Sequence, residues 1–163
     1  MLKSLITKII KFGLLLSFLI SVYYFHRVAL QQEARLTVDA LGQYIQAYKI
    51  IEGKSINSLR ELPPFQIISP SYSFFLNSDN IKNGMWKGYK FDLQVLKSNR
   101  FVVSASPFGQ FPGKQEFAIT ERGILKYNTE NVDTEADSYE EVAAWNELPR
   151  MEHLRTKERK EKF

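Results

Sequence analysis

The first fifty residues read as one uninterrupted helical segment, because no proline occurs before Pro63. Lys3, Lys8 and Lys11 precede a charge-free apolar run over residues 12–25. A polar, amphipathic stretch follows directly and continues to Gly53. This order predicts a membrane helix that continues into a surface helix and holds a small domain at a bilayer.

The apolar run fits either a membrane anchor or the centre of a secretory signal peptide. As a helix it spans about 21 Å, less than a hydrocarbon core of about 30 Å. Apolar residues on both sides extend it, and no small-x-small pair for signal peptidase follows in residues 23–30. An uncleaved anchor is therefore predicted, and its leading lysines place the N-terminus in the cytoplasm.

Charge and composition argue against several function classes. The net charge is +4. Without the three leading lysines, 19 of the 22 basic side chains remain against 18 acidic ones. A nearly neutral domain argues against nucleic acid binding. The absence of cysteine excludes disulfides, thiolate metal sites and a cysteine nucleophile, and the histidines are only His26 and His153. Ser104 and Ser106 fit the solvent face of a strand, so no enzyme activity is expected.

Helical spacing continues beyond the anchor. A buried stripe is predicted for a helix over residues 34–52, made by Ala34, Val38, Leu41, Ile45, Tyr48 and Ile51. Gly53 suits a left-handed C-terminal cap. Ser58 to Glu61 forms a capping-box pattern that predicts a second short helix, which Pro63 ends. Residues 63–87 are expected to form an ordered loop that can include a short strand near 72–76.

A period of two then predicts two consecutive hairpins. Four strands are expected over residues 89–95, 101–105, 117–119 and 124–127, with turns at 97–99 and 121–123. One apolar sheet face would be covered by the helix of residues 34–52. The predicted fold is α+β, a long N-terminal helix on an antiparallel sheet of about four strands. The residues expected to carry this fold are Tyr44, Tyr48, Leu59, Leu62, Tyr89, Phe91, Phe101, Val103, Phe117 and Ile119.

The chain is divided into an anchor at 1–30, an α+β domain at 31–128 and a charged tail at 129–163. The tail is acidic and then basic, with a short helix expected from Tyr139 to Glu147 and a solvated end. Asp133, Glu135 and Asp137 alternate as calcium ligands can. However, Ser138 and Ala144 stand where a calcium-hand loop needs Gly and Glu, so a solvated acidic run is favoured over a calcium site.

Three segments resemble type IV pilins and the major pseudopilins of type II secretion systems. They are the helix followed by Ser-Leu-Arg-Glu-Leu at 58–62, the Gly-Tyr-Lys-Phe and Phe-Val-Val-Ser-Ala-Ser-Pro hairpin at 88–107, and the hairpin at 116–124. The resemblance covers roughly residues 34–127. It implies a structural, interacting protein of the bacterial inner membrane, with its domain in the periplasm or outside the cell. Its implied partners are the lipid bilayer and other pilin-like subunits or secretion-system proteins.

The processing motif of such proteins is only partly present. Gly13 after Lys11-Phe12 matches the end of a prepilin leader, but the fifth residue beyond it is Phe18 instead of the usual Glu. Filament assembly therefore does not follow from the resemblance. An anchored domain that does not polymerise, and a secreted binding protein or enzyme released by signal cleavage, remain alternatives. Five aromatic residues are expected mainly as core or loop anchors, and they would mark a partner surface only if several were exposed together: Tyr72, Phe74, Phe75, Phe108 and Phe111.

Overall fold

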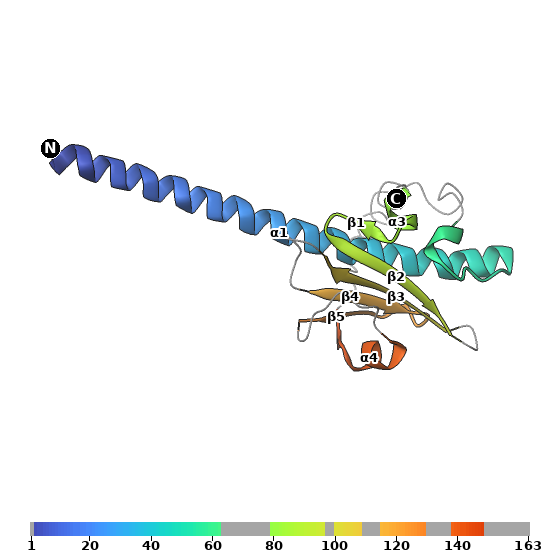
Figure 1. Ribbon diagram of the computed structural model, residues 1–163. Coiled ribbons are helices and arrows are strands. Elements are labelled where there is room, and N and C mark those ends of the chain that lie inside the picture. Colours follow the sequence, from blue (N-terminus) through green and yellow to red (C-terminus); the bar gives the residue numbers. More distant parts are fainter. Residues whose placement is uncertain (1, 63–78, 97–99, 109–114, 130–137, 149–163) are drawn as a thin grey trace, which may run out of the picture.

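The computed structural model describes residues 2–62, 79–96, 100–108, 115–129 and 138–148. Helix α1 (Leu2–Glu52) is continuous over 51 residues, and the rest of the described chain packs against its second half (Figure 1). This confirms the predicted long N-terminal helix. Gly53 ends α1 with a left-handed φ of 67°, and its N–H donates to the carbonyl of Lys49 at 3.0 Å.

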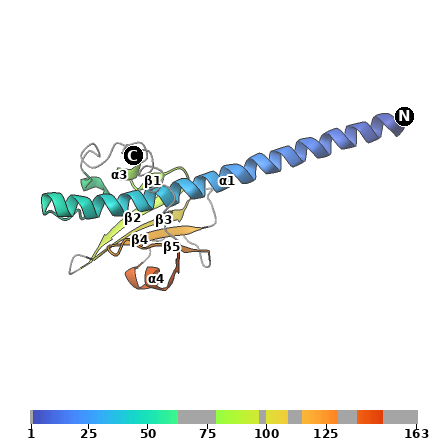
Figure 2. The ribbon, with the colours of Figure 1, turned by 180° about the vertical axis from the view of Figure 1, so that it is seen from behind.

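The buried stripe of α1 is shorter than the sequence pattern predicts. Ala34, Val38, Leu41 and Ile45 are all less than 5 % exposed, whereas Ile51 is 60 % exposed. The prediction for Ile51 is wrong because the last turn of α1 extends beyond the strands (Figures 1 and 2). The helical period therefore continues farther than the surface that it packs against.

The sheet is an antiparallel meander with strands in the order β1-β2-β3-β4-β5-β6. Its strands are β1 (Met85–Trp86), β2 (Tyr89–Val95), β3 (Phe101–Pro107), β4 (Glu116–Thr120), β5 (Leu125–Asn128) and β6 (Asn146–Glu147). Phe91 pairs with Ala105, and Val103 pairs with Ile119. The four predicted strands are confirmed as β2 to β5, and β1 and β6 add a short strand at each edge.

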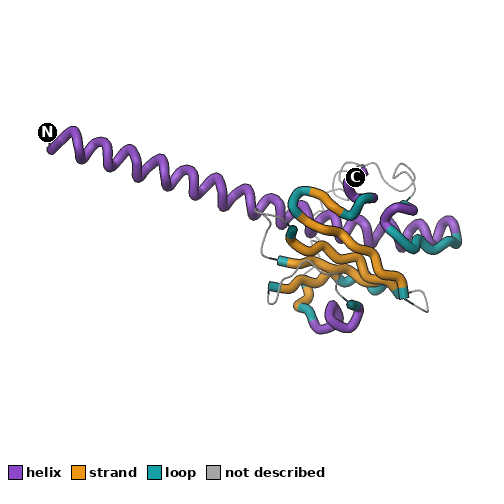
Figure 3. The backbone as a smooth tube through the Cα atoms, viewed as in Figure 1, coloured by secondary structure: helices purple, strands orange, loops and turns teal. Residues whose placement is uncertain are grey.

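One face of the sheet packs against α1, and the short helix α4 (Tyr139–Ala144) covers part of the other face (Figure 3). Side chains such as Phe91, Val103 and Ile119 join α1 in the main core. On the opposite face, Val102 and Ala118 pack with Val142 of α4. Strand β3 is consequently buried at all seven positions, and not only on the alternating face that faces α1.

Two segments differ from the sequence predictions before the sheet begins. The turn after Ser58 is the single 3₁₀ turn η1 (Leu59–Glu61), and the Ser58 side chain makes no capping bond. The Glu61 carboxylate instead accepts from the backbone N–H of Asn57 at 3.0 Å. The region expected as a loop contains α3 (Asp79–Lys82) and β1. The short strand considered within this loop at 72–76 lies outside the described residues.

Part of the segment expected as a charged tail is folded against the sheet. Ser138 and Glu141 form a capping box at the start of α4, since each side chain accepts the other residue's backbone N–H. The helix ends at Ala144, before the predicted Glu147, because the chain enters β6 and pairs with β5. Residues 138–148 thus belong to the packed layers, and residues 149–163 lie outside the described residues.

Candidate membrane-anchoring helix and its junction with the domain

The first half of α1 exposes an unbroken series of apolar side chains. Every large apolar residue from Ile6 to Val28 is at least 42 % exposed, and Phe25 reaches 71 %. Soluble monomers rarely expose such a contiguous apolar surface. By length and composition, α1 holds a segment that is long and apolar enough to cross a membrane. This agrees with a single-pass anchor near the N-terminus.

The helix changes from exposed to buried between Phe25 and Ala34, and the domain begins at this junction. The Arg27 guanidinium lies 5.3 Å from the centre of the Tyr23 ring. The Lys87 ammonium, in the turn between β1 and β2, lies 2.6 Å from the Glu33 carboxylate on α1. An ion pair therefore joins the β1–β2 turn to the helix where the helix leaves the domain.

The β1–β2 turn has a backbone that Lys does not favour. Trp86 pairs with Tyr89, so Lys87 and Gly88 form a two-residue hairpin turn. Their φ values are 46° and 81°, both in the left-handed region. Type I′ turns have this pattern and prefer Asn-Gly or Gly-Gly. The Lys87 ammonium also lies 5.0 Å from the centre of the Trp86 ring.

Polar groups are buried at the same end of the sheet. Tyr89 is 1 % exposed, and its hydroxyl makes no hydrogen bond within the part of the chain that the structure describes. Burial raises the pKa of Tyr89 well above its usual value, and nearby Arg27 partly opposes this shift. The Glu116 carboxylate is also buried and accepts from the Asn128 side-chain amide at 2.9 Å.

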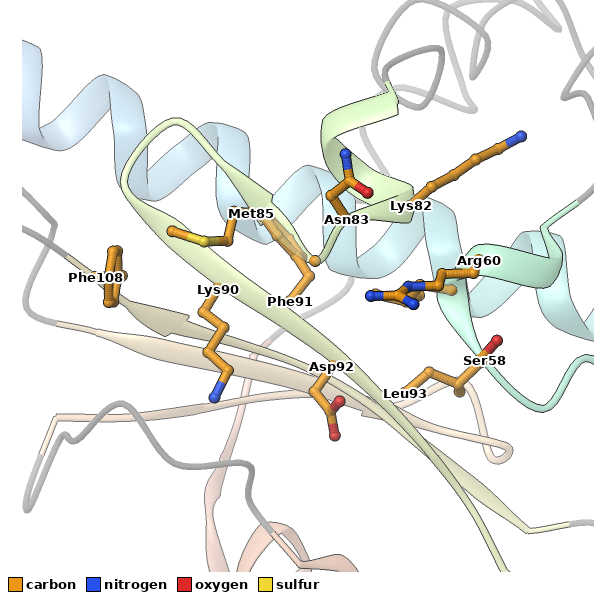
Figure 4. A pocket seen from close by; sticks show the side chains of 12 residues that line it. Ser58, Arg60, Lys82, Asn83, Met85, Lys90, Phe91, Asp92, Leu93 and Phe108 are labelled. Carbon is orange, nitrogen blue, oxygen red and sulfur yellow. The ribbon is translucent and has the colours of Figure 1, made fainter.

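Two open hollows lie beside these elements. One of about 500 Å³ lies beside the Glu33–Lys87 ion pair, between residues 26–30 of α1 and the β1–β2 turn, and Phe108 lines it. The other, of about 450 Å³, lies between η1, α3 and the first half of β2 (Figure 4). Its rim carries Arg60, Lys82 and Lys90, with Asp92 on β2. This second hollow combines cations with apolar walls and holds no histidine or cysteine.

The candidate processing site lies within the exposed helix. Gly13 is part of α1, and a methyl group added at its Cα would meet no atom within 4 Å. Phe18 is 65 % exposed on the same helix. The candidate calcium ligands Asp133, Glu135 and Asp137 lie outside the described residues. Among the described residues, no three His, Cys, Asp or Glu side chains gather to hold a metal ion.

The remaining sequence candidates are distributed as follows. His26 is exposed beside the first hollow, and His153 lies outside the described residues. Ser104 and Ser106 are each only 2 % exposed, so their assignment to the solvent face is wrong. Phe108 is 45 % exposed, so it is not the core anchor that was expected as the main interpretation. Tyr72, Phe74, Phe75 and Phe111 lie outside the described residues.

The Glu33–Lys87 contact was not predicted from the sequence. The only local signal was the Lys87-Gly88 dipeptide between alternating residues, which resembles a hairpin turn but does not identify its partner on α1.

Comparisons with known protein families, curated proteins and solved structures returned no match. The helix and its junction are therefore the features on which a function can be based.

Proposed function

We propose that this protein is a pilin-like structural subunit of a bacterial secretion or type IV pilus-like apparatus, anchored in the inner membrane with its N-terminus in the cytoplasm. The observation that supports this most strongly is the division of α1. One continuous helix exposes apolar side chains over its first half and buries a stripe against an antiparallel sheet over its second half. The proposed role is structural rather than enzymatic.

The exposed half of α1 suits both a bilayer and contacts between subunits. No charged side chain occurs between Lys11 and Arg27, so the segment can be surrounded by lipid or by equivalent helices. Where equivalent helices surround the segment, apolar side chains from several copies would pack together while each domain stays at the membrane surface. Other pilin-like subunits are the proposed partners, together with the bilayer.

A specific residue favours the alternative of an anchor that does not polymerise. Phe18 occupies the position after Gly13 where pilin-like subunits carry Glu. An apolar ring cannot form an ion pair with the amino terminus of a neighbouring subunit. If Phe18 prevents docking, the fold serves only to hold its domain at the envelope surface.

Cysteine crosslinking separates these two candidates, since the chain contains no cysteine of its own. Leu15→Cys and Val22→Cys place single thiols on the exposed half of α1, seven residues apart and on one face. Ala143→Cys places a thiol on exposed α4 as a matched control. Disulfide-linked dimers at positions 15 and 22, but not at 143, are expected in native membranes. Monomers at all three positions would contradict assembly and leave the plain anchor.

A further inference from the structure

The junction between α1 and the domain lies at the depth of lipid headgroups, if the anchor spans the membrane as proposed above. Counted from Lys11, a helix crosses about 30 Å of hydrocarbon by Gln31. Glu33 follows within one turn and pairs with Lys87 of the β1–β2 turn. Because α1 is continuous, no linker separates the domain from the bilayer. The β1–β2 turn therefore faces the headgroup layer.

The side chains around the first hollow have the chemistry of a membrane interface. His26 and Leu30 line it from α1, and Lys87 and Phe108 line it from the sheet. Trp86 lies under the Lys87 ammonium, and the exposed rings of Tyr24 and Phe25 precede the junction on the helix. Aromatic rings beside cations are typical of the zone between hydrocarbon and water.

The identity of residue 87 is not explained by the turn alone. Its left-handed φ of 46° would be adopted with less strain by Asn or Gly. The ion pair with Glu33 engages the ammonium, but the Lys87 side chain is still 44 % exposed. An ammonium has three donors, so it can contact Glu33 and a phosphate oxygen together. Sparsely populated backbone conformations are often retained where a side chain has a functional contact.

We propose that the hollow between α1 and the β1–β2 turn binds the headgroup of an anionic phospholipid in the leaflet next to the domain. The Lys87 ammonium contacts the phosphate, while Leu30 and Phe108 lie against the glycerol and the upper acyl chain. Arg27 on α1 and Lys87 in the turn outnumber the Glu33 carboxylate at this junction, and this excess positive charge gives the site its preference for anionic over zwitterionic lipid. This inference rests on the proposed anchoring and identifies the surface that meets the bilayer.

The two tryptophans allow a direct test with the full chain in vesicles. Trp86 lies at the junction, whereas Trp145 packs on the sheet face opposite α1. A Trp145→Phe variant reports from Trp86 alone, and a Trp86→Phe variant reports from Trp145 alone. Vesicles contain phosphatidylcholine brominated near the headgroup end of its acyl chains, with or without phosphatidylglycerol. We expect at least twofold stronger quenching of Trp86 than of Trp145, increasing with phosphatidylglycerol.

A Lys87→Asn change, made in the Trp145→Phe background, separates lipid binding from folding. Asn suits the left-handed turn, which offsets the loss of the partly exposed ion pair with Glu33, so the thermal unfolding temperature should stay nearly unchanged, while the response to phosphatidylglycerol should be lost. Equal quenching of both tryptophans, or a phosphatidylglycerol response that persists in Lys87→Asn, would overturn the headgroup site. Vesicle flotation is measured in each sample. A chain that floats with unquenched Trp86 overturns the headgroup site alone, and a chain that does not float overturns the anchoring as well.

Discussion

Gly42 on α1 lies directly against the side chain of Ile119 on β4. A methyl group added at the Gly42 Cα would come within 2.5 Å of Ile119 Cγ2. Glycine in the middle of a helix is unfavourable by roughly 1 kcal/mol relative to alanine. Here its lack of a side chain allows the helix backbone to approach the centre of the sheet. This close approach between the two main layers thus depends on a residue that weakens the helix locally.

Gly42→Ala should lower the free energy of unfolding, because overpacking costs about 1–3 kcal/mol and exceeds the gain in helix propensity of about 1 kcal/mol. In an Ile119→Ala background, the same change should raise stability, since the clashing atoms are absent. The measurement is thermal or denaturant unfolding of the full chain in detergent micelles. A Gly42→Ala effect of the same sign in both backgrounds would contradict the close approach of the α1 backbone to the Ile119 side chain.

Two apolar side chains in the amphipathic half of α1 should respond differently to replacement by alanine. Leu41 is fully buried and Ile51 is 60 % exposed. Leu41→Ala should therefore cost about 2–5 kcal/mol of unfolding free energy, and Ile51→Ala should stay within about 0.5 kcal/mol. Equal losses in the same unfolding experiment would mean that the last turn of α1 is covered.

Tyr89 predicts a loss of stability at alkaline pH. Its folded pKa is raised by burial, so its contribution is fully present below its unfolded pKa of about 10 and is lost as pH rises above that value. Tyr89→Phe removes a buried hydroxyl and should reduce this alkaline loss while leaving stability at pH 7 unchanged or higher. Unfolding measured between pH 8 and pH 11 checks both effects. An unchanged alkaline slope in Tyr89→Phe would contradict this origin.

Low pH should destabilise the start of α4. The Glu141 carboxylate accepts the backbone N–H of Ser138 at 2.7 Å, and these hydrogen bonds lower the pKa of Glu141. The stabilisation is present above the unfolded pKa of Glu141, near 4.5, and is lost as pH falls through the lower folded pKa. Amide exchange of residues 139–142, corrected for intrinsic rates, should accelerate at low pH. Glu141→Gln should weaken this pH dependence, whereas Glu140→Gln should retain it.

Periodic segments were predictable from the sequence because burial on one face leaves a repeat. Val38, Leu41 and Ile45 mark the packed face of α1, and the alternation after Tyr89 marks β2 and β3. Strands β1 and β6 have only two residues each, which is too short for a repeat. The second covered face was missed because a single short helix covers it. Val142 is the only buried side chain of α4. A single buried residue leaves no periodic pattern, so the position of α4 on the sheet could not be inferred from spacing.

One part of the candidate site was likewise predictable from the sequence, and another part was not. The exposed apolar half of α1 was predictable, because charge-free composition over residues 12–25 is a local property. The junction was not, since Glu33 and Lys87 meet only when β1 and β2 pack beside α1. A long-range ion pair has no signature in local periodicity. It depends on the register of the sheet and on where the helix enters it.

The central claim is that the first half of α1 stays attached and resides in a membrane. The most direct test is the N-terminal sequence and intact mass of the mature protein, measured after fractionation of cells into membrane and soluble parts. We expect a carbonate-resistant membrane protein that begins at Met1 or, after cleavage beyond Gly13, at Leu14. A soluble product that begins near residue 30 would contradict it.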